Sequence, residues 1–268
     1  FIEGAISTST NYSWNKTAIV LFSVDFGPPS LNITDPTSGT VNADFSLAGN
    51  AIDALGVIDI KYSLTGESTS LTDIDIFDGD QTSVAISETV DISTLVTGEY
   101  ILQVVATDQG NYSVTQQIPI TIDKTNPTIN ILQPANSGPA LNGANVSVTG
   151  EAFDNRLVGA VFLWHGLVAA GDPALPSRTS PGVYDAGGYT QLGGTSLWNT
   201  TIDTTAITLT GVDEYRIRVV AIDNIGNVGV PYEHLAQIDQ TSDRPTVDFS
   251  NISTDPGTPS RLGTGARI

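Results

Sequence analysis

One supersecondary pattern occurs twice in this chain, and the repeat limits the possible folds more than any other feature. Each copy begins with Glu-Tyr, continues three residues later with Val-Val-Ala-x-Asp, and then reaches Gly-Asn. The copies occupy residues 99–111 and 214–227. Self-similarity of this kind indicates repeated structural units rather than one large domain.

A second shared pattern lies upstream of each copy. Gly-x-Ala-x-Asp occupies residues 49–53 and 150–154, and in both places it continues a stretch in which apolar and other residues alternate. Strict alternation is typical of a half-buried antiparallel strand. Three similar segments begin with proline, at Pro29, Pro127 and Pro245. Proline suits the first residue of an edge strand, so we expect two units to open at Pro29 and Pro127 and a third to start at Pro245.

The strand that follows Glu-Tyr shows the alternation most clearly. Tyr100 and Tyr215 begin an apolar face, while Arg216 and Arg218 fall on the opposite face, which we expect to be wet. A tyrosine in this place fits a tyrosine corner. Short strands separated by turn signals, without helical periodicity, predict an all-β fold built from antiparallel β-sandwiches.

The repeat divides the chain. We expect residues 1–26 to be the last strand of a preceding unit and residues 27–123 to form a complete sandwich. We expect residues 124–239 to form a second sandwich with a Gly- and aromatic-rich insertion at about 165–198, and residues 240–268 to start a further unit. Short Asp/Pro linkers join the units.

The Gly-x-Ala-x-Asp and Glu-Tyr motifs, closed by Ile-Asp-Lys-Thr-Asn-Pro at 122–127, together resemble bacterial Ig-like repeats of large surface proteins. The resemblance implies tandem Ig-like sandwiches that act as non-catalytic stalks or spacers. It also implies an extracellular, cell-surface, prokaryotic location, with neighbouring Ig-like units or copies of the chain itself as partners. A fold analogy does not supply an activity.

Charge excludes one class of partner. The chain has 29 acidic and 10 basic residues and a net charge of −19. Nucleic-acid binding needs clusters of Lys and Arg, and none is present. The acidity suits a solvated surface or sites for hard cations. There is no Cys for disulfides or thiolate metal sites, and no apolar run is long enough to span a membrane.

Strand topology suggests where acidic side chains meet. In an Ig-type sandwich the second and sixth strands run in the same direction, so the loops that follow them lie at one end, where the preceding linker also arrives. Each unit therefore gathers one trio of carboxylates, which are Asp25, Asp53 and Asp108 in the first and Asp123, Asp154 and Asp223 in the second. Such a trio favours Ca²⁺ at the junctions. The alternative is that these residues only cap turns.

A run of acids from Asp73 to Asp80 is superficially similar to a calcium loop. The third acid is displaced by one position from EF-hand spacing, and position 12 is Val84. We expect a solvated hairpin turn there.

The insertion contains the clearest candidates for ligand binding. Tyr184 and Tyr189 lie between glycines and could form a flat surface on which a sugar stacks. The alternative is an elaborated loop that packs its aromatic side chains onto the sandwich.

Catalysis finds little support, so we predict no enzyme activity. His165 and His234 are the only histidines, both are expected at the surface, and no Gly-x-Ser-x-Gly occurs. Glycosylation is a separate possibility, because Asn-x-Ser/Thr occurs seven times. The acceptor residues are Asn11, Asn15, Asn32, Asn111, Asn145, Asn199 and Asn251.

Three roles remain open from the sequence. The first is a structural segment of an extracellular surface protein. The second is a subunit of an extracellular filament or sheath that assembles through its terminal strands. The third is a carbohydrate-binding accessory module that uses the loop at 165–198, with glycans as partners.

Overall fold

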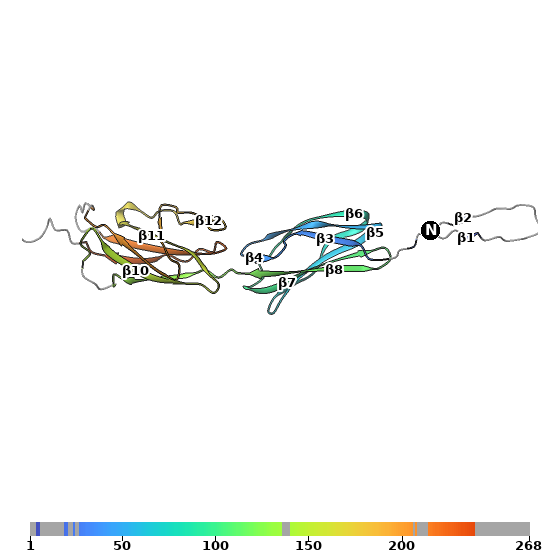
Figure 1. The fold of residues 1–268 in the computed structure, drawn as a ribbon, viewed down its shortest axis with the longest axis horizontal. Coiled ribbons are helices and arrows are strands. Elements are labelled where there is room, and N and C mark those ends of the chain that lie inside the picture. The colour runs from blue at the N-terminus through green and yellow to red at the C-terminus, as the bar shows by residue number, and fades with distance from the viewer. Residues whose placement is uncertain are drawn as a thin grey trace, which may run out of the picture.

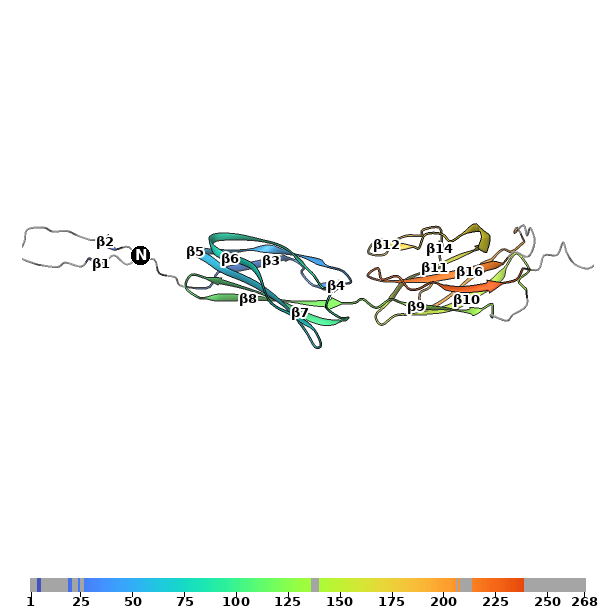
Figure 2. The same cartoon turned by 180° about the vertical axis from the view of Figure 1, so that it is seen from behind.

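The structure is a computed structural model that describes residues 4–5, 19–20, 24, 27–135, 140–205, 207 and 214–238. The described residues from 27 onward form two β-sandwiches placed end to end (Figure 1), and residues 4–5 and 19–20 form a separate two-stranded ladder. The view from behind shows the same serial arrangement, with one linker between them (Figure 2). The fold prediction of tandem Ig-like β-sandwiches is confirmed. No helix in the described ranges is long and apolar enough to cross a membrane.

The first sandwich contains six strands, and hydrogen bonds connect them in the order β3-β5-β7-β8-β4, with β6 beside β5. The strands are β3 (Ser30–Asp35), β4 (Gly39–Val41), β5 (Phe45–Gly66), β6 (Ser70–Val90), β7 (Gly98–Asp108) and β8 (Ser113–Ile122). All pairs are antiparallel except β4 with β8, which is parallel.

Strand β5 passes from one layer of this sandwich to the other. Its first half pairs with β3 and its second half with β7. The register shifts between Ile52 and Val57, where the Asp53 side chain accepts hydrogen bonds from the N–H groups of Leu55 and Gly56. One bent strand therefore continues through the irregularity.

The second sandwich has two separate sheets, in the orders β15-β10-β9 and β14-β11-β16-β17. The insertion adds a two-stranded hairpin, β12-β13, and one turn of 3₁₀ helix, η1 (Val168–Ala170). The strands are β9 (Thr128–Gln133), β10 (Val146–Phe153), β11 (Val158–Leu167), β12 (Ser177–Ser180), β13 (Val183–Asp185), β14 (Thr190–Gln191), β15 (Leu197–Ile202), β16 (Tyr215–Asp223) and β17 (Tyr232–Ala236).

The repeated Tyr strand has different surroundings in the two units. In β7 the buried residues alternate with more exposed ones, so one face contacts solvent. In β16 every residue from Val219 to Asp223 is buried. Val220 and Ile222 of its outer face pack with Phe162 and Tyr189 in a second apolar cluster, separate from the core between the sheets. The insertion therefore covers the outer face of this sheet.

Little of the predicted flanking units lies within the described residues. Strand β1 (Gly4–Ala5) pairs with β2 (Ile19–Val20) in an antiparallel ladder. Asp25 and the segment 240–268 lie outside the described residues. The assignment of these ends to neighbouring units remains a prediction.

Candidate metal centre at the junction

The junction between the sandwiches contains three of the predicted carboxylates. Asp123 directly follows β8, and its N–H donates to the carbonyl oxygen of Val41 at 2.9 Å, so its main chain remains attached to the first sandwich. Asp154 directly follows β10, and Asp223 is the last residue of β16. Two carboxylates of the second sandwich therefore meet one that is anchored to the first.

One carboxylate oxygen from each of Asp123, Asp154 and Asp223 lies within 4.8 Å of the other two. Calcium–oxygen distances are about 2.3–2.6 Å, so two ligands on opposite sides of one ion are about 5 Å apart. The spacing of the three oxygens therefore suits a shared cation. Asp123 and Asp223 are completely buried, and Asp154 is half-buried.

Each carboxylate of the trio also caps a turn with Oδ1. Asp223 accepts from the N–H groups of Ile225, Gly226 and Asn227. A separate pair of N–H groups, from Arg156 and Leu157, donates to Asp154 at 2.9 Å each, and the N–H of Thr125 donates to Asp123 at 3.1 Å. The turn-capping alternative is therefore correct for one oxygen of each side chain.

The second oxygens of Asp123 and Asp154 are different. Both Oδ2 atoms are buried, and neither has a hydrogen-bond partner within the described part of the chain. Unpartnered anionic oxygens away from water are unfavourable, and nearby like charges add to the cost. A bound cation would satisfy both atoms, so the donor set fits a hard divalent ion.

Asn227 is a junction residue that the sequence reading passed over. Its Nδ2 donates to Oδ2 of Asp223 at 2.7 Å and to the main-chain carbonyl oxygen of Asp123 at 2.9 Å. Asn42 of the first sandwich donates to Oδ1 of Asn227 at 3.2 Å. The signal was present in the repeated Gly-Asn, but this dipeptide by itself is ordinary turn chemistry.

Other polar contacts also cross the junction. The amide Nδ2 of Asn155 donates to Oδ1 of Asp123 at 3.2 Å. Arg156 forms an ion pair with Glu99 of the first sandwich. Because Arg156 and Glu99 are largely exposed, this ion pair contributes little stability by itself.

The first predicted trio is only partly described. Asp53 caps the turn within β5, and Asp108 accepts a hydrogen bond at Oδ1 from the N–H of Tyr112 at 3.0 Å. Asp108 is fully buried, and its Oδ2 has no partner among the described residues. Asp25 lies outside them, so a metal site at this end remains a prediction.

The insertion is packed rather than open. Tyr189 is 5% exposed, and the ring of Tyr184 lies edge-on to Phe162 with centroids 5.8 Å apart. Burial raises the pKa of both tyrosine hydroxyls. This arrangement matches the alternative of a loop tucked onto the sandwich, and it does not offer the Tyr189 ring as a sugar-stacking surface.

The prediction that Arg216 and Arg218 face water was wrong. Their side chains are 13% and 14% exposed, because Asp172 of the insertion and Glu233 of β17 each pair with both of them. Arg216 also stacks over the ring of Trp164 at 5.8 Å. The alternation located the outer face of β16 correctly, but it could not indicate what covers that face.

One of the two histidines also differs from expectation. His165 is exposed as predicted, with Nδ1 in contact with the hydroxyl of Tyr215. His234 is only 3% exposed, so its predicted surface position was wrong. Burial lowers the pKa of His234 and raises the pKa of Tyr215 to about 12. Although His165 is exposed as a residue, its ring is partly desolvated beside Tyr215, and this lowers its pKa as well.

The acidic run from Asp73 to Asp80 is solvated but is not a turn. It lies within β6 and pairs with β5. The hairpin turn precedes it, between Gly66 and Ser70. The predicted hairpin turn was therefore misplaced by several residues.

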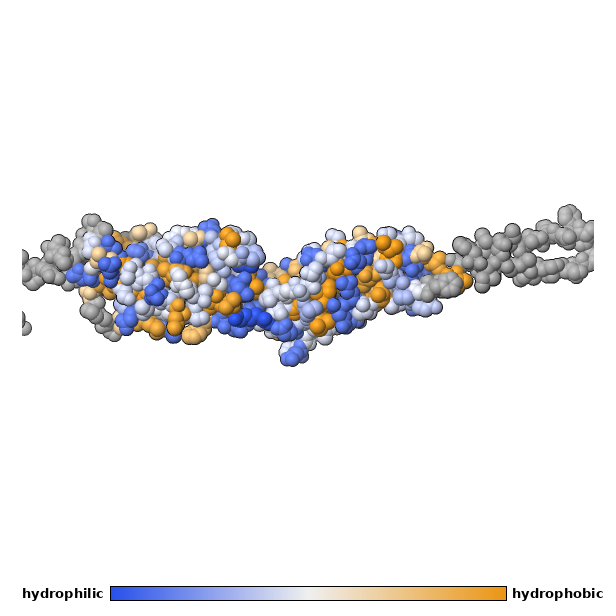
Figure 3. Space-filling view, in the orientation of Figure 1, coloured by the Kyte–Doolittle hydropathy of each residue, from blue (hydrophilic) through white to orange (hydrophobic). Residues whose placement is uncertain are grey.

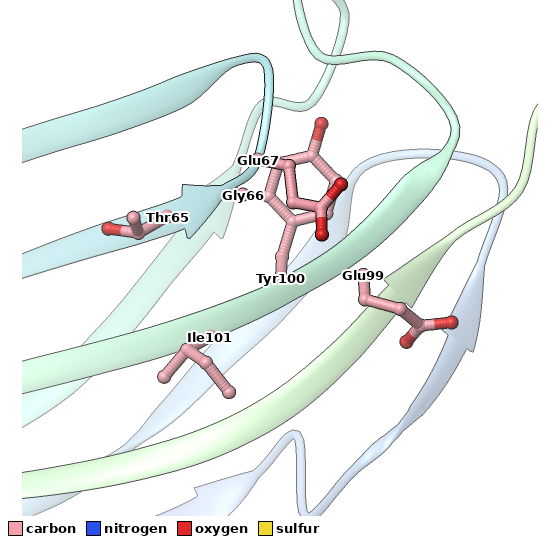
Figure 4. Close-up of a pocket in the computed structure, with 6 residues that line it drawn as sticks. All are labelled: Thr65, Gly66, Glu67, Glu99, Tyr100 and Ile101. Atoms are coloured by element: carbon pink, nitrogen blue, oxygen red, sulfur yellow. The ribbon is translucent and has the colours of Figure 1, made fainter.

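A shallow pocket of about 240 Å³ lies beside that hairpin, between Thr65–Glu67 and Glu99–Ile101. Figure 4 shows the residues that line this pocket, with the Tyr100 ring beside Gly66 and the Glu99 carboxylate pointing away from the ring. The Tyr100 hydroxyl donates to the carbonyl oxygen of Val96 at 2.9 Å, which is the hydrogen bond of a tyrosine corner. The pocket therefore borders a structural tyrosine.

Four of the predicted glycosylation acceptors fall within the described residues, and all four are exposed: Asn32, Asn111, Asn145 and Asn199. The other three, Asn11, Asn15 and Asn251, lie outside the described residues.

No protein-family model and no curated protein matches the sequence. Among solved structures, the chain is similar to the fibronectin(III)-like modules of Clostridium thermocellum CbhA, at 14% identity and a TM-score of 0.38, over 82% of this chain and 99% of that one. It is similar to a tetra-tandem repeat from the extending region of a large adhesion protein at 18% identity and a TM-score of 0.31, over 84% of this chain and 52% of that one. It is also similar to the D00-D0 domain of intimin at 11% identity and a TM-score of 0.30, over 79% of this chain and 100% of that one. The sandwich assignment itself rests on the strand pairing described above.

Proposed function

We propose that this chain is a structural, non-catalytic spacer segment of an extracellular surface protein of a prokaryote. The observation that carries the proposal is the junction, where a short linker places two sandwiches end to end and side chains of both units contact each other (Figures 1 and 2). Serial sandwiches extend a chain over distance, and in this proposal the several polar contacts between them restrict the relative domain motion that a short linker alone would leave.

The surface agrees with this role. Figure 3 shows hydrophilic and hydrophobic residues interspersed over one face, with hydrophilic residues gathered where the sandwiches meet. The strong net negative charge keeps such a surface soluble. In this proposal, the partners along the axis are neighbouring Ig-like units.

We also propose that the trio Asp123, Asp154 and Asp223 binds Ca²⁺ and fixes the angle between the units. The support is the meeting of three carboxylate oxygens and the two buried Oδ2 atoms that lack partners. Three carboxylates supply half or less of the six to eight oxygens that Ca²⁺ takes, so carbonyl oxygens or water would complete the shell. The ion would replace mutual repulsion by attraction to a common centre.

Small-angle X-ray scattering tests the spacer. The expected result is a pair-distance distribution of an elongated, two-body particle that is unchanged across a range of protein concentrations. A compact particle, with the sandwiches side by side, would refute the spacer. Negative-stain images of native material separate the alternatives: discrete stalks support the spacer, whereas continuous fibres support the filament or sheath. A glycan array tests the carbohydrate-binding module, for which the spacer predicts no bound glycan.

A further inference from the structure

The insertion of the second sandwich reaches the junction. Hairpin β12-β13 lies at the end of the second sandwich that faces the first (Figures 1 and 2). Within this hairpin, Nη1 of Arg178 donates to the main-chain carbonyl oxygen of Ile225 at 3.1 Å. Ile225 belongs to the turn that Asp223 caps, so the hairpin is attached to the loop that carries a junction carboxylate.

The carbonyl oxygen of Ile225 is also contacted by a side chain of the first sandwich. Nδ2 of Asn42 approaches the oxygen of Ile225 at 3.4 Å, in addition to its contact with Asn227. A side chain added at Gly226 would lie 3.5 Å from Cβ of Arg178 and 3.8 Å from Nδ2 of Asn42. Three segments far apart in the sequence therefore converge on one turn.

The hairpin is in turn anchored to the sheet beneath it. Arg178 and Tyr184 are directly opposed across β12 and β13, and Tyr184 packs against Phe162 of β11. The Tyr184 hydroxyl also lies against Gly159, where a Cβ atom would overlap it and would lie 2.7 Å from the carbonyl oxygen of Asp223. Movement of Arg178 relative to the sheet is restricted by this packing.

We propose that the insertion is a brace for the junction, in which Arg178 and Asn42 are positioning residues that hold the turn after Asp223 against the first sandwich. The planar guanidinium of Arg178 offers fixed donors, and the Asn42 amide reaches the same turn from the other unit. This proposal rests on the spacer function but does not require the ion. If Ca²⁺ binds, reciprocity requires that contacts which favour the docked junction also favour the ion.

The absence of cysteine allows a direct test. Spin labels at Ser87→Cys in the first sandwich and Thr201→Cys in the second occupy exposed strand positions. Pulsed electron–electron double resonance then gives the distribution of distances between the sandwiches. Each variant is measured with chelator and with millimolar calcium. The matched control is Ser177→Ala, an exposed neighbour on the same hairpin.

The expected result with chelator is a distance distribution at least about twice as broad for Arg178→Ala and for Asn42→Ala as for the parent, with Ser177→Ala unchanged. Arg178→Lys keeps the charge but loses the planar fork, so we expect broadening there too. If Arg178→Ala lowers the melting temperature of the second sandwich, the distance distribution of Asn42→Ala decides whether the brace exists, because Asn42 lies outside that sandwich. Narrow distributions in both the Arg178 and Asn42 variants overturn the brace. A broad distribution already present in the parent instead overturns the fixed junction of the spacer.

Discussion

Asn227 donates a hydrogen bond from Nδ2 to the main-chain carbonyl oxygen of Asp123, 104 residues earlier in the chain. Because the same amide nitrogen also contacts Oδ2 of Asp223, one side chain connects the linker to the last residue of β16. The Gly-Asn of the repeat therefore contributes to the junction as well as to a turn.

Asn227→Ala is expected to weaken calcium binding by about tenfold, since residues that orient metal ligands commonly contribute 10–100-fold in affinity. Isothermal titration with calcium measures the change. Asn224→Ala is the control, because Asn224 is exposed in the same loop. Equal affinities in the two variants would show that Asn227 does not position the ligands.

Asp223→Asn removes one charge and leaves an oxygen to accept the three N–H groups of its turn. Extracellular calcium sites have dissociation constants on the order of 10⁻⁴–10⁻³ M, so the parent should respond to millimolar calcium. We expect its scattering curve to change when chelator is added, and the variant in excess calcium to match the chelated parent.

Asp203→Asn serves as the charge-matched control for Asp223→Asn, because Asp203 is exposed and caps a turn formed with Thr205. This control should respond to calcium as the parent does. Identical curves for parent and Asp223→Asn, with and without chelator, would leave the three aspartates as turn caps only.

Tyr100 tests the corner in the first sandwich. It is 3% exposed, and its hydroxyl contacts Thr69 in addition to Val96. Tyr100→Phe is expected to lower the free energy of unfolding by about 1 kcal/mol through the lost hydrogen bond. Tyr100→Ala is expected to lower it by about 3–5 kcal/mol, and Tyr215→Ala should do the same in the second sandwich. Urea unfolding measures each value; a Tyr100→Phe variant as stable as the parent contradicts the corner.

The repeated glycine of Gly-x-Ala-x-Asp has a steric cause. A Cβ atom at Gly49 would overlap the carbonyl oxygen of Asn32, and one at Gly150 would overlap that of Asn130 and the Trp198 ring. Gly49→Ala and Gly150→Ala should each reduce stability by about 1–3 kcal/mol, as overpacking does. Gly193 has no atom within 4 Å of its Cβ position, so Gly193→Ala is the neutral control. Thermal unfolding that ranks Gly193→Ala with the other two would refute this explanation.

The sequence predicted the buried faces of the repeated strands and the meeting of three aspartates at the junction. Alternation in β7 and β16 identified their inner faces, and the order of strands predicted that Asp123, Asp154 and Asp223 meet. The first inference depends on the side-chain period, which is visible in the sequence. The second depends on the strand directions of an Ig-type sandwich, which the resemblance to Ig-like repeats implied.

The sequence did not indicate which segments cover the outer face of β16. Arg216 and Arg218 have the alternation of a wet face, but ion pairs with the Asp172 and Glu233 carboxylates place them beneath the insertion. The glycine-rich insertion has no regular period that could indicate this packing. His234 was misjudged for a related reason, because a polar residue type does not reveal a buried strand position.

The last prediction concerns pH. Burial lowers the pKa of His234, so the folded second sandwich holds this ring neutral where the unfolded chain, with a pKa of about 6.5, takes up a proton. The unfolded state therefore binds more protons below about pH 6.5. Stability contributed by the neutral ring is fully present above that pH and is lost as pH falls towards the folded-state pKa. The shift of His165 has the same sign and adds to the effect.

Tryptophan fluorescence during urea unfolding measures this loss. Trp164 and Trp198 both lie in the second sandwich, and Trp14→Phe removes the remaining tryptophan signal. We expect the unfolding midpoint to fall between pH 7.5 and 5.5 in the parent, and to fall less in His234→Gln because glutamine does not titrate. The double variant with His165→Gln should be the least sensitive to pH. A midpoint that falls equally in the parent and the double variant would assign the pH dependence to carboxylates instead of the histidines.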